Sequence, residues 1–498
     1  MSIHLKAKAL MTAVSLAVLA GCATSPAGMN APAAGGAQMP AQWQVTPLAS
    51  GAMGSALSLD EAWWQRFDDP VLNDLIQRVL DCNLSLGVAV LRVQQARLKT
   101  DLADADRLPS VSASVGASAS RLLDGGPTSR GASAKLSATW EVDLWGKVSA
   151  QRDAAQWAMQ ASEDDRRAVA LSLVGTTARL YWQLAYLDQR VTSAEQSLAY
   201  ARQTQDLVGA QYKAGSVSGL EQAQAQQAVS SQEAGLAQLT QTRMEARQAL
   251  ALLLDGPAQS ASLPEQPRWP QTAWPTLAPG LPADILSRRP DVRAAESRLR
   301  GSYASVDVTR TSYYPSLSLT GSVGSSSESL SHVLRDPVGS LGATLLLPFL
   351  QFRDMQRNVA ISEAEAEASV LNFRQTLYQA LSEVDQGLSA QAQYAVQTQA
   401  LEQRLLQARK VERLTELRYR SGAEPLKSWL DAQESRRTAE LSLADARYNQ
   451  LSSWVSLVQA LGGGAPAVEG ARGARASSGA SASAPSPAST SASNPTTP

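Results

Sequence analysis

The sequence predicts an α+β membrane protein built from a duplicated unit, in which each copy supplies β-strands to a membrane and long helices outside it. Three observations predict this fold class: an internal repeat, two pairs of alternating segments, and helical runs too long for a compact domain. A long, nearly collinear repeat indicates duplication. Six residues coincide at a shift of 206 positions, in the pairs Ala89/Ala295, Arg92/Arg298, Asp101/Asp307, Pro109/Pro315, Ser110/Ser316 and Ser112/Ser318.

Each copy carries a pair of segments in which apolar and small polar residues alternate. In the first copy the pair spans about 109–143, with Val111 and Val115 on one face and serines on the other. The second pair spans about 315–350, joined through a Ser- and Gly-rich loop that contains His332. An apolar face opposite a small polar face over ~10–12 residues is typical of outer-membrane barrel strands. A hairpin of a soluble sandwich is the alternative, but the chain lacks further strand-like segments for a second sheet.

Long helical runs follow each strand pair and indicate coiled-coil hairpins. A helix of about 65 residues would be about 100 Å long. Glycine turns at Gly215 and Gly422 precede the returning helices, which predicts antiparallel hairpins over 146–254 and 353–461. A further helix is predicted over 291–312. The 3.5-residue period that indicates a coiled coil is carried by Leu173, Thr177, Leu180, Leu184, Leu187, Val191, Ala194, Leu198 and Ala201.

The N-terminus predicts export. Lys6 and Lys8 precede an apolar run that is long enough for a signal peptide and too short to span a membrane. The run ends in Leu19-Ala20-Gly21-Cys22, which resembles a bacterial lipobox and implies cleavage before Cys22, followed by lipidation of that cysteine. Ala23, in place of an aspartate, implies delivery to the outer membrane.

Composition divides the rest of the chain. Pro-, Ser- and Gly-rich stretches without periodicity are typical of tethers and disordered tails. The predicted division is a signal peptide at 1–21, a lipidated N-terminus and flexible tether at 22–58, a first repeat at 59–256, an irregular connector at 257–282, a second repeat at 283–463, and a disordered tail at 464–498.

Composition also disfavours an enzyme or a nucleic-acid-binding protein. The net charge is -1, from 44 basic and 45 acidic residues, so a basic face for nucleic acid is not expected. The chain has two histidines, His4 and His332, which cannot form a His-based triad or a His-ligated metal site. No cofactor or metal is expected. Cys82, the other cysteine besides Cys22, is expected to pack as a small apolar residue.

Several motifs together resemble the outer membrane factor family, and more narrowly its TolC-like, NodT-type lipoprotein branch. The resemblance covers roughly residues 60–463 and implies a trimer, in which three copies share one β-barrel that is continued by an α-barrel. Closure of a barrel satisfies every strand edge in lipid. The motifs are Phe67-x-Asp69-Pro70-x-Leu72, Trp140-x-x-Asp143-Leu144-Trp145-Gly146, Leu286-x-x-Arg289-Pro290-Asp291, Tyr314-Pro315-Ser316-Leu317, and the Tyr-x-x-Gly tips at Tyr212 and Tyr419.

The resemblance implies the exit duct of a tripartite efflux pump, and hence a role in antibiotic resistance. Such a duct passively conducts drugs or other small molecules from an inner-membrane transporter of the resistance-nodulation-division (RND) type, joined through a periplasmic adaptor protein. Its location would be the cell outer membrane, lipid-anchored and extending into the periplasm. Two alternatives remain open: a lipid-anchored periplasmic coiled-coil scaffold without a pore, and an exit duct for type I protein secretion.

The same resemblance places a gate at the periplasmic constriction on Asp431. Lys427 lies four residues earlier on the same helical face, where relatives commonly have an apolar residue, so the two side chains could pair. An ordinary exposed helix residue is the alternative for Asp431. A second departure is Gln351-Phe352-Arg353-Asp354, where relatives often show Asp-x-Gly-Arg. Expected adaptor contacts, with a turn-only role as the alternative, are Gly215, Ser216, Val217, Gly422 and Ala423.

Overall fold

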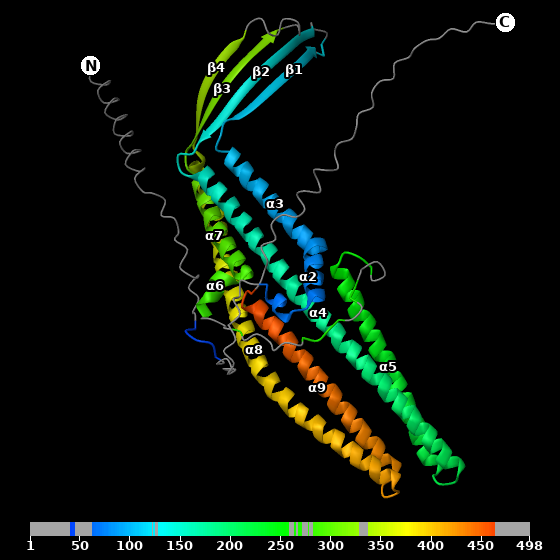
Figure 1. The fold of residues 1–498 in the computed structure, drawn as a ribbon. Coiled ribbons are helices and arrows are strands. Elements are labelled where there is room, and N and C mark those ends of the chain that lie inside the picture. The colour runs from blue at the N-terminus through cyan, green and yellow to red at the C-terminus, as the bar shows by residue number, and fades with distance from the viewer. Residues whose placement is uncertain are drawn as a thin grey trace, which may run out of the picture.

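The computed structural model places a β-sheet at one end of an elongated molecule and two helical hairpins at the other (Figure 1). Cys22, the loop with His332, the predicted tail and most of the connector lie outside the described residues. Within those residues, no helix is both long and apolar enough to cross a membrane. The structure describes residues 40–44, 62–121, 123–124, 128–257, 263–264, 267–270, 277, 282–327 and 337–463.

The strands of both copies form one antiparallel sheet, in the order β1-β2-β3-β4. The copies meet at its centre, where Ala138 of β2 lies opposite Gly321 of β3. The outer edges, on β1 and β4, have no partner among the described strands. The four predicted strands are confirmed as β1 (Ser110–Arg121), β2 (Thr128–Val142), β3 (Ser316–Ser327) and β4 (Val338–Leu346).

The last strand is shorter than the alternating pattern predicts. Alternation continues to about Phe349, whereas β4 ends at Leu346 and a 3-10 turn, η6 (Pro348–Leu350), follows. Proline has no N–H to donate to a ladder, so Pro348 ends the pairing.

Helices of the first copy precede and follow its strand pair. The chain enters them through a 3-10 turn, η3 (Trp63–Phe67). Asp69 caps the next helix by accepting hydrogen bonds from the backbone N–H groups of Val71 and Leu72. The helices are α2 (Pro70–Cys82), α3 (Leu84–Ala105), α4 (Lys147–Lys213) and α5 (Gly219–Leu253).

The second copy repeats the long elements. Its equivalents of α3, α4 and α5 are α7 (Pro290–Thr311), α8 (Phe352–Arg420) and α9 (Leu426–Ala460). Before α7 the chain forms a short turn and helix, η4 (Pro282–Asp284) and α6 (Ile285–Arg288).

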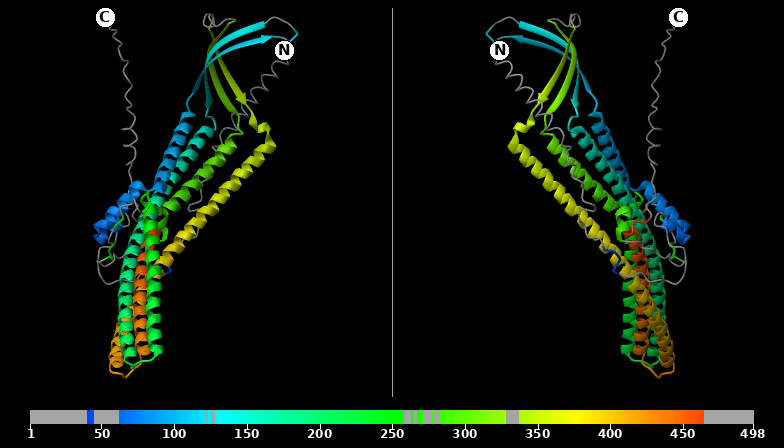
Figure 2. Two further views of the ribbon diagram at one scale, coloured as in Figure 1. Left: turned by 90° about the vertical axis from the view of Figure 1, so that its right-hand side faces the viewer. Right: turned by 90° about the vertical axis from the view of Figure 1, so that its left-hand side faces the viewer.

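The hairpins are coiled coils along their inner seams. Helix α4 packs along α5, and α8 packs along α9. Toward the tips the hairpins lie side by side, whereas α8 diverges from α4 on the way to the sheet (Figure 2). Most residues of the predicted 3.5-residue period are buried, namely Leu173, Thr177, Leu184, Leu187, Val191, Leu198 and Ala201.

The main hydrophobic core lies at mid-length, where η3 and α2 pack on α4 and α9. Trp63 is 0% exposed, and its ring lies 5.4 Å from that of Trp454 and 6.4 Å from that of Trp182. A second core joins α6 and α7 to α8 and to the end of α9. Trp43 packs against this second core, so residues 40–44 of the predicted tether lie against the body of the molecule.

Cys82 is exposed with a free thiol, so the prediction that it packs as a small apolar residue is wrong. It is the last residue of α2, whose core-facing side chains include Ile76 and Val79. The chain turns at Asn83, whose side chain caps α3. This turn leaves the end of α2, and with it the thiol, in solvent.

An aromatic junction joins the sheet to the helices. The Trp145 indole N–H donates to the Pro315 carbonyl at 2.7 Å, and its ring contacts Tyr314 edge-on with centroids 5.5 Å apart. Trp145 belongs to the first copy and Pro315 to the second, so the contact ties the two copies together where strands give way to helices. Nearby, Asp143 accepts hydrogen bonds from two backbone N–H groups in the first turn of α4.

Candidate channel wall, tips and gate

The two faces of the sheet differ in chemistry. On one face a row of serines crosses all four strands, and Oγ–Oγ distances of 3.0 Å and 2.7 Å join its members in pairs. The opposite face carries large apolar side chains, all exposed: Val111, Val115, Leu136, Trp140, Leu319, Val323 and Leu341. The serine row consists of Ser112, Ser137, Ser322 and Ser340.

This division suits a wall between water and lipid. Leu341 is 95% exposed in a single protomer. Exposure of a sheet face of such side chains to water would be unfavourable. The hydroxyl face, in contrast, remains hydrated. A scaffold without a pore required the alternating segments to be exposed loops, and this alternative is wrong because they pair continuously as strands.

Both hairpin tips are closed by the same glycine turn. Gly215 and Gly422 have φ of +72° and +76°, a left-handed conformation that glycine adopts without strain. In each tip the glycine N–H donates to a carbonyl of the last helical turn, Tyr212 or Tyr419, at 3.0 and 2.9 Å. The next N–H, that of Ser216 or Ala423, donates one residue further back, which completes a Schellman motif.

The predicted tip contacts divide into two groups. Gly215, Ser216, Gly422 and Ala423 are exposed. Val217 is half-buried and packs against the cluster of Val208, Ala225, Leu426 and Trp429, which joins the two hairpins just above the tips. The Val217 side chain therefore contributes to the contact between hairpins.

A polar contact reinforces that cluster. The Tyr419 hydroxyl, on α8, donates to the Gln211 side-chain oxygen on α4 at 2.8 Å. The Tyr419 ring also stacks on Trp429, with centroids 5.2 Å apart. The tips of the two hairpins are therefore held together by one hydrogen bond and a small apolar cluster.

The predicted gate residues pair with each other on the exposed side of α9. The Lys427 ammonium lies 2.8 and 3.0 Å from the two carboxylate oxygens of Asp431. The two side chains are 66% and 64% exposed. Because the pair is solvated in a single protomer, it contributes little to the stability of that protomer.

A second link joins the hairpins nearer the core. Arg190 and Tyr186 of α4 reach Asp445 of α9, where the Tyr186 hydroxyl donates to the carboxylate and the Arg190 guanidinium lies 3.5 Å from it. Burial and the hydrogen bond to Asp445 raise the pKa of Tyr186 to about 12, so its hydroxyl remains a donor at neutral pH. A groove of about 1160 Å³ runs alongside this link, and a second groove of about 860 Å³ lies between the link and the tips.

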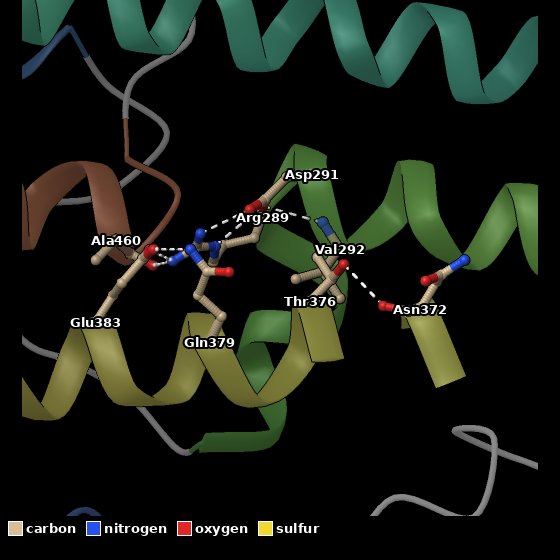
Figure 3. Close-up of polar contacts among 8 residues, drawn as sticks. All are labelled: Arg289, Asp291, Val292, Asn372, Thr376, Gln379, Glu383 and Ala460. Atoms are coloured by element: carbon tan, nitrogen blue, oxygen red, sulfur yellow. Dashed lines mark hydrogen bonds and ion pairs between the residues drawn. The ribbon is translucent and has the colours of Figure 1, made fainter. Parts of the chain in front are cut away.

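The Arg-Pro-Asp motif forms an ion cluster around the buried Arg289 (Figure 3). The Arg289 side chain is 9% exposed and donates to both carboxylate oxygens of Asp291, at 3.0 and 2.6 Å. It also donates to Glu383 of α8 at 2.7 Å and to the Ala460 carbonyl at the end of α9 at 3.2 Å. One guanidinium thus joins α7, α8 and α9, which is a structural role.

Sequence patterns did not reveal the two links between hairpins. Tyr419 and Gln211 lie 208 positions apart, and Tyr186 and Asp445 lie 259 positions apart. Tyr419 stood out only as part of a repeated tip motif, and no spacing rule connects it to Gln211.

The chain is similar in sequence to known outer membrane proteins. The family model described as "Outer membrane efflux protein" matches the chain twice, over residues 75–256 and 281–463. The pyoverdine export outer membrane protein OpmQ of Pseudomonas aeruginosa is 34% identical over 458 residues, covering 90% of this chain and 95% of its own. The toluene efflux pump outer membrane protein TtgC of Pseudomonas putida is 30% identical, covering 91% and 95%.

Solved structures show the same architecture. The outer-membrane channel OprN matches with a TM-score of 0.77 at 26% identity, covering 86% of this chain and 98% of its own. The open state of the Neisseria gonorrhoeae MtrE outer membrane channel matches with a TM-score of 0.75 at 27% identity, over the same shares.

Proposed function

Because this chain belongs to the outer membrane efflux protein family, it is an outer membrane exit duct of a tripartite pump, and we propose how its parts do that work. The duct is a trimer that works with a periplasmic adaptor and an inner-membrane transporter. The observation that carries the mechanism is the two-faced sheet with unpaired edges. Three protomers whose sheets join edge to edge place the hydroxyl face around water and the apolar face in lipid.

Transport through the duct is passive. The wall presents hydroxyl groups to a water-filled lumen. The family consists of transport proteins. Solute therefore moves down the gradient that the inner-membrane transporter, of the RND type, creates. Drugs and small secreted metabolites are the proposed cargo, since relatives are named for export of pyoverdine and for efflux of toluene.

The lipid anchor is proposed on Cys22, which lies outside the described residues. The support is the Leu-Ala-Gly-Cys sequence at the end of the signal peptide. Lipidation adds the mass of the acyl chains to the N-terminal peptide, and an N-terminal peptide without that mass contradicts the anchor.

The gate is proposed at the tips, where Lys427 and Asp431 pair on an exposed helix face. In a three-fold assembly three such pairs lie at one level around the axis. Near the tips the described contacts between the two hairpins are the cluster at Trp429 and the bond from Tyr419 to Gln211, so small shifts of the second hairpin can widen the constriction.

Asp431→Ala is expected to raise single-channel conductance of purified trimers in planar bilayers by two-fold or more. The substitution removes the carboxylate that holds Lys427, so the pair no longer narrows the opening. Asp74→Ala is the matched control, because Asp74 pairs with Arg78 at the same i,i+4 spacing but on α2. Equal conductance and ion selectivity in Asp431→Ala and wild type would falsify the gate role.

The exposed tip residues are proposed as adaptor contacts. Gly215, Ser216, Gly422 and Ala423 present backbone and small side chains at the far end of the molecule, where a partner can pack closely. Val217 adds an apolar contact only through the part of its side chain that the inter-hairpin cluster leaves open.

A further inference from the structure

The hydroxyl face of the sheet is almost free of charge. Its residues in the four strands are Ser, Thr and Gly, apart from two apolar residues near the ends of β4 and two charged residues in β2. The charged residues are Lys135, near the middle of β2, and Glu141, at its lower end. Arg121 and Arg130, the other charged residues of these strands, have the opposite parity and belong to the apolar face.

Only one of the two charges is paired. The Glu141 carboxylate lies 2.9 Å from the Lys147 ammonium at the start of α4. Lys135 is exposed, and among the described residues none forms an ion pair or hydrogen bond with its ammonium. It is therefore the one uncompensated charge on the hydroxyl face of the described strands.

The neighbouring strands leave space for this side chain. Lys135 lies opposite Ser114 on one side and Gly324 on the other. A Cβ at Gly324 would lie 2.9 Å from the Ala134 carbonyl oxygen and 3.3 Å from the Lys135 Cβ and Cγ, so a larger residue there would crowd the lysine. Small neighbours on both sides let the ammonium project away from the sheet.

We propose that Lys135 makes the membrane segment of this duct anion-selective, with organic anions as the favoured class of cargo. This inference rests on the proposed function, because it requires the hydroxyl face to line the lumen. Three copies then contribute three ammonium groups at one level, with no opposing charge on the same face at that depth. The Lys427–Asp431 pair is net neutral and does not offset them.

The lumen is narrow enough for these charges to act across it. Three copies of four strands give twelve, and at a spacing of about 4.8 Å and a tilt of about 40° the barrel radius is about 12 Å. The lysine stems carry the charges inward from that wall. The Debye length is about 10 Å at 0.1 M salt and about 30 Å at 0.01 M, so the field of the three ammonium groups spans the lumen at low salt.

Reversal potentials test the inference directly. Wild-type trimers, Lys135→Gln and Lys135→Glu are reconstituted in planar bilayers under a KCl gradient. The salt concentration is kept near about 0.01 M, where screening is weak. The wild type should show a reversal potential of the sign that chloride preference gives. Lys135→Gln should move this potential toward zero, Lys135→Glu should reverse its sign, and both differences should shrink at high salt.

Arg130→Gln is the matched control, because it removes a cation from the same strand on the opposite face and should leave the reversal potential unchanged. The series is repeated in Lys427→Ala combined with Asp431→Ala, which removes both charges of the proposed gate. Conducting trimers whose reversal potentials are equal in wild type, Lys135→Gln and Lys135→Glu at low salt overturn the inference alone. A wild-type trimer without conductance contradicts the proposed function, and the inference with it.

Discussion

At the scale of single residues, the molecule separates charges that hold the fold from exposed charges that we propose face the duct. Arg289 is buried and makes four hydrogen bonds to three partners on α7, α8 and α9. Removing Arg289 would leave two half-exposed carboxylates without their shared partner, which is more costly than losing a surface pair. Lys135 and the Lys427–Asp431 pair are exposed, contribute little to stability and are therefore available for function.

The Arg289 cluster predicts a defined response to acid. Burial alone would raise the pKa of Asp291, but hydrogen bonds and charge attraction from Arg289 outweigh it and hold the pKa below its ordinary value of 3.8. A depressed folded-state pKa means that Asp291 stabilises the fold above pH 3.8, and that this contribution is lost as pH falls through the lower, folded-state value.

As pH falls from 3.8 through the lower folded-state pKa of Asp291, the apparent Tm of wild type should therefore fall more steeply than that of Asp291→Asn, measured on purified trimers by circular dichroism. At pH 7 the variant should already have the lower Tm, because it lacks one of the two carboxylates that pair with Arg289. The control is Asp74→Asn, on the surface of α2, whose Tm should follow wild type at each pH. Parallel Tm curves for wild type and Asp291→Asn would contradict the prediction.

At the scale of elements, the two copies use the same parts with different local chemistry. The first barrel-to-helix junction has Asp143 as a cap for α4. The second, at Gln351-Phe352-Arg353-Asp354, has no side-chain cap and reaches α8 through the turn at Pro348. The tips differ in the same way, since Ser218 and Glu221 form a capping box before α5 whereas Pro425 precedes α9 without one.

Gly422→Ala is expected to loosen the second tip and weaken adaptor binding by about five-fold. Alanine in the left-handed conformation costs about 1 kcal/mol. The start of α9, which follows this turn, has no side-chain cap to offset that cost. Hydrogen exchange of the tip and the affinity of an adaptor fragment are the measurements. Gly209→Ala, in the open interior of α4, should instead slow exchange. Unchanged exchange at the tip in Gly422→Ala would argue against this account.

At the scale of the whole molecule, a single protomer is incomplete. The two edges of its sheet have no partner among the described strands, and α3 carries a stripe of exposed apolar side chains at spacings of 3, 4 and 7. We expect a neighbouring protomer to cover such surfaces in the trimer. The stripe comprises Leu84, Val88, Leu91, Leu98 and Leu102.

Leu98→Gln combined with Leu102→Gln is expected to lower the temperature at which the trimer dissociates in SDS by 10 °C or more. Each leucine is more than half exposed in one copy and should lose burial worth about 2 kcal/mol when its side chain becomes polar. Arg92→Gln, on the same helix but outside the stripe, should leave the temperature unchanged. A double variant that dissociates at the wild-type temperature would show that the stripe faces solvent or lipid.

The sequence alone determined the elements and their order. Local patterns carry that information: alternation over β1 to β4, the heptad seam of α4, and the glycine turns at both tips each reflect interactions within a few residues. The repeat then predicted one architecture for both copies. The end of β4 was predicted too late, because the alternating pattern continues past Pro348, which has no N–H for the ladder. The burial of Cys82 was predicted wrongly, because it lies at a helix end whose exposure depends on the following turn.

Only the tertiary structure decided which distant residues meet. Tyr419 reaches Gln211, Tyr186 reaches Asp445 and Arg289 reaches Glu383, each across helices whose relative rotation follows from the packing of whole hairpins. The sheet register likewise placed Lys135 between Ser114 and Gly324. A strand pattern fixes which face a side chain occupies, but the cross-strand neighbours depend on register, and register depends on the assembled sheet.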